Sequence, residues 1–150
     1  MILVDTNVLL RSAQPLHSQH AAAKEAVKTA RKRGFTPCIV PQILYEYWVV
    51  ATRPVADNGL GMTVTEAERD ISDLVRYFHL FRDERAILDR WRQLVVQHDV
   101  VGKTAHDARL VAAMDRHEVE HLLTFNDRDF KRFVGIKVVH PENIETLSQV

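Results

Sequence analysis

The sequence lacks the features that define several broad classes of protein. Its single cysteine, Cys38, allows no intramolecular disulfide and no thiolate metal cluster. No apolar run approaches the ~20 residues that a membrane-spanning helix needs. The first residues include no basic segment and reach an acidic residue, Asp5, at once, which is not typical of a signal peptide. These absences favour a protein of the reducing cytoplasm that does not associate with membranes.

The sequence also has no excess of positive or negative charge. The 20 Lys and Arg residues are balanced by 20 Asp and Glu residues, so the formal net charge is zero. Bulk positive charge therefore cannot hold a nucleic acid, and such a partner would need a local basic patch or a metal ion. With 46% hydrophobic and 27% charged residues, the 150-residue chain has the composition of a folded globular protein. We expect one domain over residues 1–150.

Short apolar segments alternate with helical patterns along the chain. We expect strands at residues 2–4, 36–40, 78–81, 121–124 and 137–139. We expect helices from residue 6, at 17–33, 41–52, 65–77, 83–101 and 105–117, and a last helical turn from residue 141. Three residues are predicted to cap these helices: Thr65 (with Glu68, as a capping box), Asp83 and Thr104. The alternation predicts a parallel sheet with helices on both faces.

Two acidic residues stand where a carboxylate is unexpected. Asp5 follows the first strand, and in open α/β sheets ligands bind outside the carboxyl ends of the strands, although helix capping is the alternative. Glu46 is the only charge in residues 43–51, whose apolar and aromatic side chains surround the helix and predict that it is largely buried. A buried carboxylate requires a partner or a shifted pKa. A structural ion pair or an exposed helix edge is the alternative for Glu46.

Further acidic residues occur later in the chain. Asp107 begins the apolar stripe formed by Leu110, Val111 and Met114. The helix dipole explains an acid in the first turn, but it does not explain an acid on this stripe. Three polar or acidic residues follow the fourth expected strand, either in an ordinary turn or at the same edge of the sheet: Asn126, Asp127 and Asp129.

Carboxylates that converge on one site repel each other, and a divalent cation removes that penalty. Oxygen ligands without thiolates favour Mg²⁺ or Mn²⁺. Zinc is less favoured, because the eight histidines form no HxxxH pair on one helix face. The pair His17 and His20 is better explained by the first turn of a surface helix.

Four segments, in this order along the chain, resemble the PIN-domain family and, within it, the VapC-type toxins of toxin–antitoxin pairs. They are residues 2–10, 41–46, 107–114 and 122–126. Residues 51–54 and 58–62 are also similar to a subset of these toxins. The resemblance implies a three-layer α/β/α fold with a central five-stranded parallel sheet. It also implies metal-dependent endoribonuclease activity, a homodimer, and inhibition by a small antitoxin protein.

The resemblance also implies roles for individual residues. Asp5, Glu46 and Asp107 match the family's acidic positions. Many relatives have aspartate where this chain has Asn126, whereas VapC-like members often keep Asn and place an acid three residues later. We therefore assign the fourth acidic role to Asp129, with Asp127 as the alternative.

In this assignment, Asp5 and Asp107 bind Mg²⁺ or Mn²⁺ most directly, and Glu46 and Asp129 complete the site through water or a second ion. The cation activates water for hydrolysis of an RNA phosphodiester bond. Three residues are expected to support the acids: Thr6, Thr124 and Asn126. Three basic residues are candidates for positioning RNA, with a solvated surface charge as the alternative for each: Arg11, Lys103 and Arg109.

Two other functions compete with the ribonuclease. A catalytically silent PIN-like module would hold RNA or a protein, but it would not need the costly carboxylates. A phosphatase with an aspartyl nucleophile would need a second aspartate where this chain has Asn7. Aromatic residues leave a further choice open, because core positions are favoured and a partner groove is the alternative for Tyr45, Tyr47 and Trp48.

Overall fold

The computed structural model describes residues 1–149. Its strands are β1 (Ile2–Val4), β2 (Pro37–Ile39), β3 (His79–Leu80), β4 (His121–Leu123) and β5 (Lys137–Val139). Its α-helices are α1 (Thr6–Ser12), α2 (His20–Lys32), α3 (Pro41–Thr52), α4 (Val64–Tyr77), α5 (Arg85–Gln97), α6 (Thr104–Arg116) and α7 (Asp127–Phe130). Two 3₁₀ turns are η1 (Val55–Asp57) and η2 (Pro141–Thr146).

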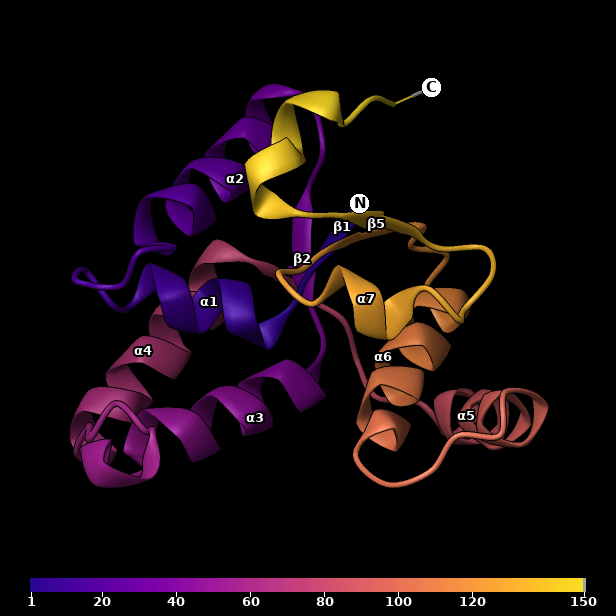
Figure 1. Cartoon of the computed structure of the whole chain (residues 1–150), viewed down its shortest axis with the longest axis horizontal. Coiled ribbons are helices and arrows are strands. Elements are labelled where there is room, and N and C mark those ends of the chain that lie inside the picture. Colours follow the sequence, from indigo (N-terminus) through magenta and orange to yellow (C-terminus); the bar gives the residue numbers. More distant parts are fainter. Residues whose placement is uncertain (150) are drawn as a thin grey trace.

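The five strands form one parallel sheet in the order β3-β2-β1-β4-β5. All residues of β1 and β2 are buried, as expected for parallel strands that are covered on both faces. Figure 1 shows α1 and α2 on one side of the sheet and α5, α6 and α7 on the other. The expected three-layer α/β/α architecture with a five-stranded parallel sheet is therefore confirmed. None of the helices within residues 1–149 has the length and apolar character that crossing a bilayer requires.

The predicted helix caps are wrong in detail. The capping box that starts α4 is formed by Thr63 and Glu66, two residues before the predicted pair. Asp83 lies before the first turn of α5 and accepts a hydrogen bond from Arg109 instead of capping. Thr104 is the first residue of α6 rather than its cap. Each of these side chains has the chemistry of a cap, and the local backbone decides which one is used.

Two further predictions need correction. Helix α3 is not buried all round, because Tyr45 is 64% and Val49 54% exposed, whereas Tyr47 is only 2% exposed. The aromatic residues of α3 are therefore divided between core and surface. The segment after β4 is not a simple turn, because residues 127–130 form the short helix α7.

The strand order creates a switch point between β1 and β4. The chain moves from β1 to β2 on one side, and β4 pairs with the other side of β1. Val4 and Leu123 are paired across these strands, so the residues that follow them, Asp5 and Thr124, leave the sheet side by side. Ligands of open α/β sheets bind at such a point. The fold therefore brings together polar residues from opposite ends of the chain.

Candidate active site

A cavity of about 760 Å³ opens beyond the carboxyl ends of β1 and β4. Its walls come from the residues after β1, from α3, and from the first turns of α6, which begins close to the first turn of α3 (Figure 1). The polar residues that line it are Asp5, Thr6, Asn7, Gln42, Glu46, Arg53, His106, Asp107, Arg109 and Asn126. Three of the four predicted acids therefore face one cavity.

Asp5 is held in a fixed orientation by its neighbours. Its Oδ1 accepts a hydrogen bond from the backbone N–H of Thr6 at 2.7 Å. Its Oδ2 accepts hydrogen bonds from the Thr124 hydroxyl at 2.7 Å and from the Asn7 amide at 3.2 Å. Both carboxylate oxygens thus have partners although the residue is only 6% exposed.

The hydrogen bonds around Asp5 do not fully compensate its burial. Burial raises the pKa of Asp5 to about 6, and the negative charge of Glu46 also raises it. The hydrogen bonds from Thr124, Thr6 and Asn7 act in the opposite direction. The ionised form of Asp5 is therefore costly, and a cation in the cavity would stabilise it.

Asp107 lies across the cavity in the first turn of α6, and its ionised form is also disfavoured. Burial and the charges of Asp5, Asp129 and Glu46 together raise its pKa to about 6, although His106 acts in the opposite direction. Asp129 acts from α7 and does not itself line the cavity. The four predicted acids therefore form one electrostatic cluster, although they come from four separate segments of the chain.

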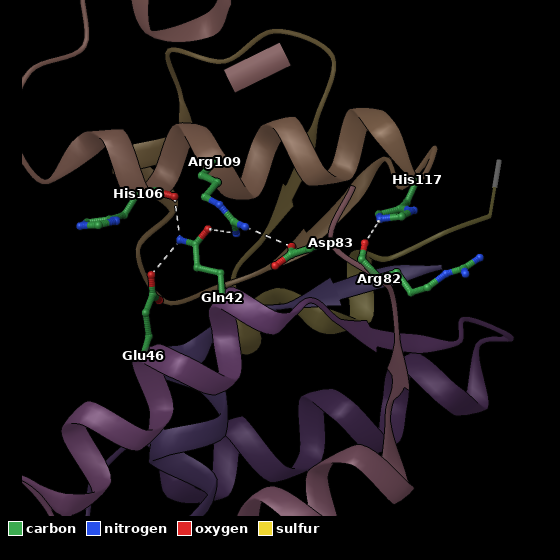
Figure 2. Close-up of polar contacts among 7 residues, drawn as sticks. All are labelled: Gln42, Glu46, Arg82, Asp83, His106, Arg109 and His117. Atoms are coloured by element: carbon green, nitrogen blue, oxygen red, sulfur yellow. Dashed lines mark hydrogen bonds and ion pairs between the residues drawn. The ribbon is translucent and has the colours of Figure 1, made fainter. Parts of the chain in front are cut away.

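Glu46 is oriented by two polar side chains rather than by an ion pair. Its Oε2 accepts a hydrogen bond from the Thr6 hydroxyl at 2.9 Å, and its Oε1 accepts one from the Gln42 amide at 2.8 Å. Figure 2 shows that Gln42 also donates to the backbone carbonyl of His106 and accepts from Arg109, whose guanidinium contacts Asp83. The predicted alternative of a direct structural ion pair is therefore not what holds Glu46.

The remaining predicted residues differ in position. Thr6, Arg109 and Asn126 line the cavity. Thr124 is fully buried behind Asp5 and also accepts a hydrogen bond from the Asn126 backbone N–H. Asp127 is the first residue of α7 and is not part of the cavity wall. Two of the three predicted RNA-positioning residues, Arg11 and Lys103, also lie outside the cavity wall. Arg11 instead donates hydrogen bonds to Gln14 and Gln19.

Asn7 and Gln42 have structural roles at the site that the sequence analysis missed. Asn7 donates to Asp5 and Thr124 and accepts from the Phe125 backbone N–H, so it joins the ends of β1 and β4. Gln42 lies one helical turn before Glu46, and this four-residue spacing was the available signal. Asn7 also bears on the phosphatase alternative, because an amide that donates to Asp5 stands where that chemistry would need a second carboxylate.

The residues present fit a divalent cation that keeps part of its water shell. Within residues 1–149, no group of three His, Cys, Asp or Glu side chains is close enough to hold a metal without other ligands. Mg²⁺ is commonly bound by one or two carboxylates, with water and substrate oxygens completing its shell. Asp5 and Asp107, which face one cavity and whose pKa values are both raised to about 6, match that pattern.

Comparison with solved structures shows that the same fold occurs in structures of toxins and toxin–antitoxin complexes. The chain is similar to a toxin–antitoxin complex from Klebsiella pneumoniae, with 23% identity, a TM-score of 0.66, and coverage of 94% of this chain and 98% of that chain. It is similar to VapBC2 of Rickettsia felis bound to a promoter DNA fragment, with 14% identity, a TM-score of 0.66 and coverage of 93% and 98%. It is also similar to VapC20 of Mycobacterium tuberculosis, described as a toxin that cleaves the sarcin–ricin loop, with 15% identity, a TM-score of 0.64 and coverage of 91% and 99%.

Sequence comparison gives a family but no individual relative. No curated protein matches the chain. Residues 1–128 match the family model described as the PIN domain. The matched segment includes Asp5, Glu46 and Asp107 and ends one residue before Asp129. The chain belongs to the PIN-domain family.

Proposed function

We propose that this protein is a metal-dependent endoribonuclease that acts as the toxin of a toxin–antitoxin pair. The observation that carries this proposal is the convergence of Asp5, Glu46 and Asp107 on one cavity, where burial and the neighbouring carboxylates raise the pKa of Asp5 and of Asp107. Carboxylates that repel each other destabilise the folded protein, and such groups are found together mainly at functional sites, where a bound cation can neutralise them. The similarity in fold to VapC proteins from toxin–antitoxin systems supports the toxin role.

Asp5 and Asp107 would hold Mg²⁺ or Mn²⁺ directly, and Glu46 and Asp129 would act through water. When bound, the cation would activate water and stabilise the negative charge that develops on the phosphate. Thr124, Thr6 and Asn7 keep the oxygens of Asp5 directed by hydrogen bonds, so little reorganisation of this group is needed. Thr6 and Gln42 do the same for Glu46.

The proposal extends to partners. Several similar structures are complexes of a toxin with its antitoxin, and we propose that a protein of that kind binds and inhibits this chain. We also propose that two copies form a homodimer and that the protein acts on RNA in the cytoplasm. Size-exclusion chromatography with light scattering tests the dimer, and co-expression with the protein encoded beside it tests the inhibition.

The decisive experiment measures metal binding and RNA cleavage in parallel. Isothermal calorimetry with Mn²⁺ is expected to show binding to the wild-type protein and loss of binding in Asp5→Asn. Cleavage of a structured RNA is expected only with Mg²⁺ or Mn²⁺ and is expected to be lost in the same variant. A wild-type protein that binds no Mn²⁺ and cleaves no RNA would instead be the catalytically silent module.

A further inference from the structure

The cavity extends past the carboxylates along one row of α3. Its far wall includes Tyr45, Val49, Val50 and Arg53. Tyr45 and Val49 are four residues apart and lie one above the other on α3, and Arg53 is the residue that directly follows the helix. Arg53 follows Glu46 by seven residues, which is two helical turns or ~10 Å along the axis. An extended ligand bound at the carboxylates can therefore reach Arg53.

Arg53 carries a charge that has no partner. The cavity is lined by two guanidinium groups, and that of Arg109 is engaged by Asp83 and Gln42. In the part of the chain that the structure describes, Arg53 forms neither an ion pair nor a side-chain hydrogen bond. A guanidinium presents donors in a planar fork that matches phosphate oxygens. Arg53 is thus available for an anionic group in the cavity.

The position of Arg53 at the end of α3 suggests a simpler role, which is to satisfy the last carbonyl groups of the helix. The structure assigns that role to backbone groups of residues 54–62 instead. Three backbone N–H groups donate to these carbonyls: Leu60 to Val50 at 3.0 Å, Met62 to Ala51 at 2.8 Å and Gly61 to Arg53 at 2.9 Å. The guanidinium is therefore not needed for capping.

The same loop fixes the backbone of Arg53. Gly59 lies so close to it that an added Cβ atom would overlap the carbonyl group of Arg53. Only glycine permits this approach. The contact fixes the backbone at residue 53, from which the Arg53 side chain reaches the cavity wall.

We propose that Arg53 binds a phosphate of the RNA strand beside the phosphate that is cleaved. The strand would run along α3, with a base against the exposed faces of Tyr45 and Val49, which are 64% and 54% accessible. Aromatic and apolar side chains suit the face of a base, and a cation suits the backbone. This inference rests on the proposed ribonuclease function and names how its substrate is held.

The test compares Arg53→Ala with Arg53→Lys and with Arg92→Ala, a matched control that removes an exposed cation of α5 outside the cavity. Arg53→Ala is expected to raise the KM for RNA about tenfold with kcat and Mn²⁺ affinity unchanged. Its RNA affinity is also expected to depend less on salt, with the log–log slope reduced by about 0.7. Arg53→Lys keeps the positive charge, so the salt dependence of RNA affinity should stay as in the wild type. The KM should lie between those of the wild type and Arg53→Ala.

A binding measurement separates this inference from the ribonuclease proposal. Fluorescence anisotropy with labelled single-stranded RNA is carried out in an Asp107→Asn background, with and without Arg53→Ala. RNA binding that requires Arg53, in a wild-type protein that does not cleave, would overturn the ribonuclease proposal alone. If the wild type cleaves RNA but RNA binding is the same with and without Arg53, the proposed role of Arg53 is wrong and the ribonuclease proposal stands. The ligand of the Tyr45, Val49 and Arg53 surface would then be a protein. Absence of both binding and cleavage would overturn both.

Discussion

At the sheet end of the cavity, each carboxylate oxygen of Asp5 and Glu46 accepts a hydrogen bond, and burial together with neighbouring acids raises the pKa of Asp5 and of Asp107. At the far end, Tyr45 and Val49 are exposed, and Arg53 has no charged partner within residues 1–149. The first end is rigid and electrostatically strained, as expected where charge must be stabilised during a reaction. The second end is open and unstrained, as expected where an extended substrate is held.

The largest difference between the two ends is expected for catalysis. Asp107→Asn is expected to lower kcat about 1,000-fold, which corresponds to about 4 kcal/mol, because it removes a ligand of the proposed cation. Single-turnover cleavage assays measure the effect. Asp115→Asn is the matched control, since Asp115 lies on the same helix but pairs with Arg90 at the surface. Cleavage by Asp107→Asn at a rate close to wild type would show that the acidic end is not catalytic.

The strain at the acidic end also predicts how stability depends on pH. In the metal-free protein, Asp5 has a pKa of about 6, whereas an aspartate in the unfolded chain has a pKa near 3.8. Between these values the native state binds more protons than the unfolded state, so the free energy of unfolding falls as the pH rises. Asp5 alone is expected to contribute a loss of about 2 kcal/mol between pH 4 and pH 7.

Urea unfolding over this pH range, in EDTA, measures that loss. Asp5→Asn is expected to flatten the pH dependence. Mn²⁺ is expected to raise the melting temperature at pH 7 more than at pH 5, because protons compete for the same carboxylates. A pH dependence of stability that is the same in the metal-free wild type and in Asp5→Asn would contradict the assignment of strain to this end.

The open end is expected to respond to a change in shape as well as to the loss of the Arg53 charge. Gly59→Ala inserts a methyl group against the backbone of Arg53 and is expected to lower the free energy of unfolding by about 2 kcal/mol. Because the change displaces Arg53, the KM for RNA should rise while Mn²⁺ affinity stays the same. Gly102→Ala is the control: its φ of +64° makes alanine strained there, but no atom obstructs the new Cβ. It should lower stability without changing KM.

The two ends also differ in how far sequence patterns predict them. Glu46 in an apolar helix and Asp107 on an apolar stripe each break a local pattern. Asp5 also caps α1, as the alternative interpretation expected, so its place at the end of a strand is informative only together with the other two acids. Gln42 and Asn7 break no such pattern, and their roles depend on contacts with residues far along the chain. The exposed face of α3 was missed because apolar residues are the expected signal of burial, and an exposed binding surface uses the same residues.

Local ambiguity accounts for the errors in element boundaries. Residues 63–68 contain two overlapping capping-box patterns, and only the first, Thr63 with Glu66, is used. The four-residue helix α7 is too short to show helical periodicity, so its acidic sequence is typical of a turn. These errors leave the architecture unchanged, because the strand order depends on the buried apolar segments.

The smallest expected effect concerns Gln42, which connects the acidic end to the rest of the fold. Gln42 is 6% exposed, and its amide donates to Glu46 at 2.8 Å and to the His106 carbonyl at 2.9 Å (Figure 2). Its own carbonyl accepts from Arg109 at 3.0 Å, which fixes the orientation of the amide, because only this atom faces a donor. Gln42 therefore links α3, which carries Glu46, to the first turn of α6, which carries Asp107.

Gln42→Leu removes these bonds while keeping a buried side chain of similar size, and we expect kcat to fall about tenfold, or about 1.4 kcal/mol, with the KM for RNA unchanged. Gln42→Glu is the sharper variant, because it brings a fifth carboxylate beside Glu46 and gives Arg109 a second acidic partner. We expect it to lower kcat further and to shift the rising limb of the pH–rate profile to higher pH, since like charges disfavour ionisation. A purely structural role would lower stability in both variants and leave the pH profile where it is in the wild type.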